Sequence, residues 1–221
     1  EYHAEHLPLG TDTLIAEGLC RRVAKRAGAV LAPLIPYAPT MHWAGGSRDG
    51  DVDFPPDALS PYLEAMFQSL INMGFRRIYV VCGHQGRDGM PATLARAALH
   101  RVQLRIASGW LPGWGGRGAP PAADIFELVR ICGYDEFVDY AAVEGEKPMP
   151  IGHAGRGETQ LMLALYDGLV ALDAVQPDPP PEWLADLPLA DREDGARWVG
   201  RCVDAWVRHL QPAAEKREDE V

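Results

Sequence analysis

The hydrophobic pattern of the chain predicts a series of amphipathic helices. In residues 13–27, apolar residues recur every three or four positions, and basic residues occupy the opposite face. Thr11 or Asp12 is suited to cap the start of this helix, and Gly28 is suited to end it. The same pattern predicts further helices at residues 60–73, 91–100, 122–132, 159–169 and 192–210.

Short apolar runs between these helices are typical of buried strands. They occupy residues 29–36, 77–82 and 102–107. Because helix and strand alternate, the pattern favours an α/β layer fold with a largely parallel sheet. A Gly-, Pro- and Asp-rich loop at 38–57 is long enough to suggest a functional role. We expect one domain at residues 1–212 and a charged C-terminal tail at 213–221.

The charge of the chain argues against two classes of partner. The formal net charge of the 221 residues is −10, which is unfavourable for binding nucleic acid or an anionic membrane surface. No apolar run is long enough to span a bilayer. The four cysteines are widely separated and form no CxxC pair, so we expect reduced, mostly buried thiols and a cytoplasmic protein.

Side chains that bind metals or move protons gather in three segments. The segments are EYHAEHLPLGTD (residues 1–12), VVCGHQG (residues 80–86) and HAGRGET (residues 153–159). Their candidate residues are Glu1, His3, Glu5, His6, Asp12, His84, His153 and Glu158. Ligands bind beyond the carboxyl ends of strands in an open parallel sheet, so we expect the three segments to share one site. This expectation includes a strand before residue 1.

The types of residue and their spacing predict a metal site. Glu1 and His3 are two positions apart, so both side chains point the same way in an extended segment. Imidazole and carboxylate without thiolate suit Zn, Mn or Fe in a catalytic rather than a structural site. A carboxylate such as Asp12 can bridge two metals that together activate water.

Taken singly, the same residues have structural interpretations. His84 at the end of a strand is compatible with a hydrogen-bonded structural histidine. Glu158 near a helix start favours the helix dipole. His6 is compatible with a capping group or with a group that orients a ligand. The order and spacing of the whole set favour the functional interpretation.

The three segments together resemble the creatininase (creatinine amidohydrolase) family. The first block of that family has the form E-x-H-G-x-H-L-P-x-G-T-D, which residues 1–12 follow closely. The last block, H-A-G-x-x-E-T, is matched by residues 153–159. The middle block, N-G-H-G-G-N or N-G-H-Y-E-N, is degraded here to C-G-H-Q-G-R at residues 82–87. The blocks extend over about residues 1–165 in the family's order.

The resemblance implies a three-layer α/β/α fold with a mostly parallel central sheet. It also implies a homo-oligomer, often a hexamer, and two divalent metals per chain (Zn, Mn or Fe). Carried over by position, Glu1, Asp12 and His84 hold one metal, and His3 and the bridging Asp12 hold the other. The partner it implies is a small-molecule substrate.

The resemblance also implies the catalytic roles. In creatininase the last ligand of the second metal is the Glu of the N-G-H-Y-E-N block, where this chain has Gly86. We expect Glu158 to replace it. A metal-bound hydroxide would attack a carbonyl carbon, and His153 would deliver a proton to the leaving group.

Several departures from the family pattern concern the substrate. Ala4-Glu5 replaces Gly-Pro, and Arg87 replaces an asparagine. We expect Glu5, His6 and Arg87 to contact the substrate. The tryptophan-rich segment that precedes the H-A motif in creatininase is Met-Pro-Ile-Gly at 149–152, so an aromatic clamp for creatinine is not expected there.

Three functions are compatible with these residues. The first is a metal-dependent hydrolase of a small cyclic or amide substrate. The second is a C–C bond hydrolase of a polyhydroxylated cyclic diketone such as 3-dehydro-scyllo-inosose. The third, motivated by the loss of Glu at position 86, is a non-catalytic metabolite-binding homologue.

Overall fold

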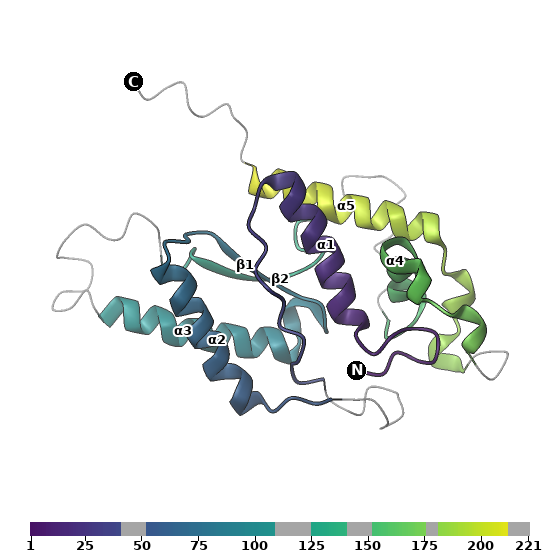
Figure 1. The fold of residues 1–221 in the computed structure, drawn as a ribbon, viewed down its shortest axis with the longest axis horizontal. Coiled ribbons are helices and arrows are strands. Elements are labelled where there is room, and N and C mark those ends of the chain that lie inside the picture. The colour runs from purple at the N-terminus through teal and green to yellow at the C-terminus, as the bar shows by residue number, and fades with distance from the viewer. Residues whose placement is uncertain (41–51, 109–124, 141–151, 176–180, 212–221) are drawn as a thin grey trace, which may run out of the picture. The chain divides into compact units, whose positions relative to one another are not determined.

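The computed structural model describes residues 1–40, 52–108, 125–140, 152–175 and 181–211 (Figure 1). The chain divides into two compact units. The first contains residues 1–34 and 134 onwards, and the second contains residues 35–40 and 52–133. The single domain at 1–212 stays a prediction. The tail at 213–221 and most of the loop at 38–57 lie outside the described residues.

The first unit is built on three helices that contact one another (Figure 1). They are α1 (Thr11–Ala27), α4 (Arg156–Tyr166) and α5 (Arg192–Leu210). Their buried apolar residues include Ile15, Leu19, Leu161, Met162, Val199, Cys202, Val203 and Trp206. Between α4 and α5 lie the short 3-10 helices η2 (Asp167–Leu169), η3 (Leu172–Ala174), η4 (Glu182–Leu184) and η5 (Leu187–Leu189).

Helix α1 begins slightly earlier than the sequence pattern predicts. Its N-cap is Gly10, without a side-chain cap, so the expected capping by Thr11 or Asp12 is wrong. Both side chains face elsewhere: the Thr11 hydroxyl donates to the Pro8 carbonyl (2.6 Å), and Asp12 faces His3. The predicted end at Gly28 is confirmed, because this glycine adopts a left-handed backbone with φ 67°.

The second unit pairs a small parallel sheet with two helices. Strand β1 (Ile78–Cys82) pairs with β2 (Val129–Gly133), with Ile78 opposite Val129 and Cys82 opposite Gly133. Helices α2 (Pro56–Asn72) and α3 (Met90–Ser108) pack together, and η1 (Gly86–Asp88) follows β1. The core of this unit comprises Leu59, Leu63, Phe67, Ala95, Ala98, Leu99, Val102, Ile125, Leu128 and Val129.

Three elements differ from the sequence prediction. Residues 102–107 continue α3 instead of forming a strand, because Val102 extends the buried helical face of Leu99. The helix predicted at 122–132 is wrong at its end, where β2 pairs with β1. Residues 29–36 form no strand: Pro33 and Pro36 lack a backbone donor, and Val30 is 78% exposed.

The remaining elements and the cysteines follow the predictions. The helices predicted at 60–73, 159–169 and 192–210 and the strand at 77–82 are present within a few residues of the expected bounds. All four cysteines are free thiols; Cys20 is half-buried and the others are buried. Among the described residues, no helix has the length and apolar character needed to cross a membrane.

Candidate metal centre

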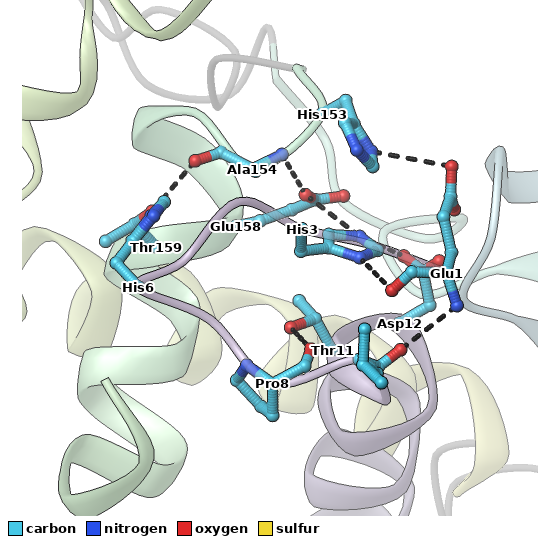
Figure 2. Close-up of polar contacts among 11 residues, drawn as sticks. Glu1, His3, His6, Pro8, Thr11, Asp12, His153, Ala154, Glu158 and Thr159 are labelled. Carbon is cyan, nitrogen blue, oxygen red and sulfur yellow. Dashed lines mark hydrogen bonds and ion pairs between the residues drawn. The ribbon is translucent and has the colours of Figure 1, made fainter. Parts of the chain in front are cut away.

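The N-terminal segment folds into a tight loop that leads into α1 (Figure 2). The main-chain nitrogen of Glu1 donates to the Leu9 carbonyl (3.1 Å), which brings the two ends of the loop together. The main-chain nitrogen of Thr11 donates to the Pro8 carbonyl (3.1 Å), so the turn before α1 is fixed. The loop thereby returns Asp12, in the first turn of α1, to the side chain of His3.

The start of α4 provides the second half of the site. Ala154 adopts a left-handed backbone with φ 52°, and its N–H donates to Glu158 Oε2 (2.6 Å). The Thr159 hydroxyl donates to the Ala154 carbonyl (3.2 Å). This tight turn holds Glu158 in the first helical turn, where the helix dipole favours a carboxylate.

The two halves meet at the imidazole of His3 (Figure 2). Its Nδ1 lies 3.0 Å from the Glu1 carbonyl oxygen. Because a carbonyl oxygen only accepts hydrogen bonds, Nδ1 carries the hydrogen and donates it. Neutral His3 therefore presents the lone pair of Nε2 towards two carboxylates, at 3.6 Å from Asp12 Oδ1 and 3.5 Å from Glu158 Oε2.

These distances fit metal ligation better than direct hydrogen bonding. Buried His3 is 1% exposed, and within the described part of the chain its Nε2 has no hydrogen-bond partner. Ligand atoms of His3, Asp12 and Glu158 all lie within 4.8 Å of one another. Metal–ligand bonds of about 2.1 Å in tetrahedral geometry place neighbouring ligand atoms about 3.4 Å apart. The nitrogen-to-oxygen separations match that spacing, and the ligand types suit Zn, Mn or Fe.

The close packing of His3, Asp12 and Glu158 also shifts the pKa values of His3 and Glu158. Burial alone would lower the pKa of His3, but the Asp12 and Glu158 carboxylates outweigh it and raise the pKa to about 9. Burial and the neighbouring carboxylates of Asp12 and Glu1 raise the pKa of Glu158 to about 7, against the opposing effect of His3. Two carboxylates close to one imidazole thus favour a positive charge between them, which a metal ion could also supply.

His153 lies beside this cluster. Its ring centre is 4.4 Å from that of His3, and its Nδ1 lies 3.6 Å from Glu1 Oε1. Burial and the neighbouring His3 lower the pKa of His153, so the imidazole is neutral at pH 7. Within the described residues its Nε2 has no hydrogen-bond partner, which leaves this atom able to exchange a proton with another group.

His6 lies behind the cluster rather than at the surface. It is 1% exposed, and its Nε2 lies 2.9 Å from Thr159 Oγ1. Since the Thr159 hydroxyl already donates to the Ala154 carbonyl, it accepts a hydrogen from His6 Nε2. His6 thereby ties the N-terminal loop to the turn that holds Glu158. Its expected contact with substrate stays a prediction.

The other expected substrate residues have exposed side chains. Glu5 follows Ala4, which adopts a left-handed backbone with φ 59°, and it accepts a hydrogen bond from the Tyr2 hydroxyl (2.6 Å). Arg87 lies in η1 of the second unit. Substrate contacts of Glu5 and Arg87 stay predictions.

His84 belongs to the second unit, directly after β1. It stands in the turn between β1 and η1, as the sequence predicted. Gly86 in that turn adopts φ 56°, a conformation that favours glycine over residues with a side chain. The expected ligation of a metal by His84 together with Glu1 and Asp12 stays a prediction.

Sequence reasoning missed three residues that shape the site. Ala154 and Thr159 belong to the H-A-G-x-x-E-T block, so their position in the motif was a usable signal. Trp183 gave no such signal. It lies in η4, two residues after Pro181, and its ring centre lies 6.0 Å from that of His153.

Along nearly its whole length the chain is similar to creatinine amidohydrolases. The creatininase family, described as creatinine amidohydrolase, matches residues 1–210. The creatinine amidohydrolase of Pseudomonas putida is 29% identical over 188 residues, which cover 81% of this chain and 66% of that protein. The matched stretch is slightly less than two thirds of that relative's length.

Solved structures show the same fold. A crystal structure of creatininase superposes with a TM-score of 0.74 at 23% identity, covering 95% of this chain and 85% of that chain. A mutant creatininase of Zn–Zn type gives 0.73 at 23% identity, and a Mn creatininase gives 0.73 at 24% identity; each covers 96% of this chain and 88% of the other. This likeness confirms the expected α/β fold. The family match over residues 1–210 shows that the chain belongs to the creatininase family.

Proposed function

We propose that this chain is a metal-dependent hydrolase that acts at a carbonyl carbon of a small cyclic or amide substrate. The observation that carries the proposal is the buried His3 Nε2, which faces the Asp12 and Glu158 carboxylates at 3.6 and 3.5 Å. The family match and the creatinine amidohydrolase of Pseudomonas putida support the same reaction class.

His3, Asp12 and Glu158 would hold one divalent metal, and Glu1, Asp12 and His84 would hold a second. Zn and Mn are the first candidates, because creatininase structures of both forms share this fold. When bound, such metals activate water and polarise a carbonyl oxygen. The chain's own residues then orient the substrate and move its protons.

His153 would be the group that moves the proton. Its Nδ1 faces Glu1 Oε1, so the carboxylate would hold the hydrogen on Nδ1 and leave Nε2 as the exchanging atom. A neutral imidazole with an available Nε2 can accept a proton from water and pass it to the leaving group. Glu1 would thus orient His153 in addition to binding metal.

Metal content is the direct test of the proposal. We expect about two equivalents of Zn or Mn per chain in protein purified without chelator, measured by inductively coupled plasma mass spectrometry. Glu158→Gln should lose one equivalent, because the amide lacks the charge of the ligand it replaces. Glu5→Gln, which changes an exposed carboxylate of the N-terminal loop that is not a proposed ligand, should retain both. Full metal retention by Glu158→Gln would refute its role as a ligand.

The raised pKa of His3 predicts that metal binding depends on pH. Protonated His3 cannot bind a metal, so binding must displace a proton from a group with a pKa of about 9. We expect the Kd for Mn²⁺ to fall by up to about tenfold per pH unit between pH 7.5 and 9, where Glu158 is already largely ionised. Calorimetry in buffers of different ionisation enthalpy measures the released proton. A Kd that does not change over this range would contradict the prediction.

A C–C hydrolase of a polyhydroxylated cyclic diketone is the second candidate. The exposed Glu5 carboxylate, in the same N-terminal loop as His3, favours it because a carboxylate accepts hydrogen bonds from substrate hydroxyls. A panel of cyclic amides and cyclic polyol ketones, with the products identified by mass spectrometry, separates the two reactions. Absence of turnover with metal bound would favour a metabolite-binding homologue.

A homo-oligomer remains our proposal for the assembly. The first unit exposes apolar side chains in the segment after α1, including Val30 (78% exposed) and Leu31 (41% exposed). Exposed apolar side chains gathered in one segment are typical of surfaces that bind a partner. A second copy of the chain is the partner we propose.

A further inference from the structure

A tryptophan stands beside the proposed proton carrier. The ring centre of Trp183 lies 6.0 Å from that of His153, and the two planes are inclined by 24°. Trp183 is nevertheless 43% exposed. One part of the indole therefore contacts His153, while another part remains open to solvent or to a ligand.

The segment that follows Trp183 is firmly packed. Leu184 and Leu187 are 1% and 6% exposed. Asp186 Oδ1 accepts a hydrogen bond from the Arg156 main-chain N–H (3.1 Å). A Cβ added to Gly155 would lie 2.8 Å from the same carboxylate oxygen, so the segment and the turn after His153 are closely fitted. The position of Trp183 is thus fixed by its neighbours, not by its own burial.

The exposed face of Trp183 lies beside the proposed proton carrier, unlike the other exposed aromatic side chains of the described residues. Leu184 and Leu187 of the same segment are buried, whereas Trp183 keeps 43% of its surface exposed. The indole offers a flat, polarisable surface that stacks on planar rings and on the C–H face of saturated rings. It lies next to His153, where the reacting part of a substrate would be placed.

We propose that Trp183 forms an aromatic wall of the substrate site and selects ring-shaped substrates over linear ones. This inference rests on the proposed function and deepens it, because it narrows the substrate to a cyclic compound with one flat or apolar face. Trp183 acts in binding and takes no part in the proton transfer. Its loss should therefore raise KM more than it lowers kcat.

Binding of ring-shaped and linear probes to the Mn²⁺-loaded protein tests the proposal. The ring probes are creatinine and the cyclic polyol ketone scyllo-inosose, and the linear probe is acetohydroxamate, which binds metals directly. Trp183→Leu should weaken binding of a ring probe by about three- to tenfold, as expected for loss of an aromatic contact. It should leave acetohydroxamate binding unchanged. Trp183→Phe should restore most of the ring affinity, because it keeps an aromatic face.

The matched control is Trp198→Leu. Trp198 is a half-buried tryptophan of α5 that contacts Tyr140 and Arg201, so its loss should leave binding of all probes unchanged. Equal ring affinity in Trp183→Leu and the unmodified protein would overturn the proposal. Binding of acetohydroxamate without binding of either ring would also overturn it.

The aromatic wall and the metal-dependent hydrolase can be refuted separately. Ring binding that depends on Trp183 in a protein that retains no metal would support the aromatic wall and refute the metal-dependent hydrolase. If the protein retains metal but ring binding does not change in Trp183→Leu, the aromatic wall is refuted and the metal-dependent hydrolase is supported. A protein that binds neither metal nor any probe would overturn both.

Discussion

Replacement of His153 by alanine is expected to lower kcat by about 10²- to 10⁴-fold, the usual contribution of a positioned acid or base. We assign the proton transfer to Nε2 of His153, which has no hydrogen-bond partner among the described residues. The Nδ1 atom of the same ring lies 3.6 Å from Glu1 Oε1. We expect metal content and melting temperature to stay nearly unchanged, because His153 is only half-buried. Turnover, metal content and thermal unfolding are measured on the same preparation.

His153 could instead be a metal ligand, and the His153→Ala variant tests this alternative. Ligand atoms of Glu1, His3 and His153 also lie within 4.8 Å of one another, so His153 is close enough to bind a metal. Loss of a metal equivalent in His153→Ala would assign it as a ligand instead of a proton carrier. A fall in melting temperature alone would indicate a structural histidine. His100→Ala, at an exposed position of α3, is the control and should change none of the three measurements.

Candidate residues of the first unit could be located from sequence because short-range geometry places them. His3 and Asp12 are joined by a loop closed by Glu1 and Leu9, so their separation depends on a few residues of chain. Glu158 sits in the first turn of a helix that its own motif begins. That α4 lies beside the N-terminal loop could not be predicted from local sequence. It was predicted from the resemblance of both segments to the family pattern.

The errors in the predicted fold arose where distant parts of the chain decide the structure. Residues 129–133 form a strand because β1 lies alongside them, and no local window contains that partner. Residues 102–107 have a strand-like composition, but the helical face that they extend is already buried. Trp183 was missed because its position depends on Asp186, which packs against the turn after His153.

Substitution of Gly195 by alanine is expected to produce the largest loss of stability, because α4 and α5 cross at this residue. A Cβ at Gly195 would overlap the carbonyl oxygen of Gln160 and lie 2.5 Å from its carbonyl carbon. These are backbone atoms of α4, so no side-chain rotation relieves the overlap and the helices must separate. We expect a loss of about 3 kcal/mol in the free energy of unfolding, at the upper end for overpacking. In a chain of this size that lowers the melting temperature by about 6 to 12 °C.

Gly200→Ala in the same helix provides the matched control. Among the described residues, a Cβ at Gly200 has no neighbouring atom within 4 Å, so we expect the substitution only to remove the helix penalty of glycine. It should be neutral or stabilise the protein by up to about 1 kcal/mol. The changes in the free energy of unfolding should therefore have opposite signs in Gly195→Ala and Gly200→Ala. This difference distinguishes close packing of the two helices from a general effect of glycine in α5. Equal and small effects of both substitutions in thermal or urea unfolding would contradict the close crossing. If the crossing holds, Gly195→Ala should also weaken metal binding, because displacement of α4 carries Glu158 away from His3.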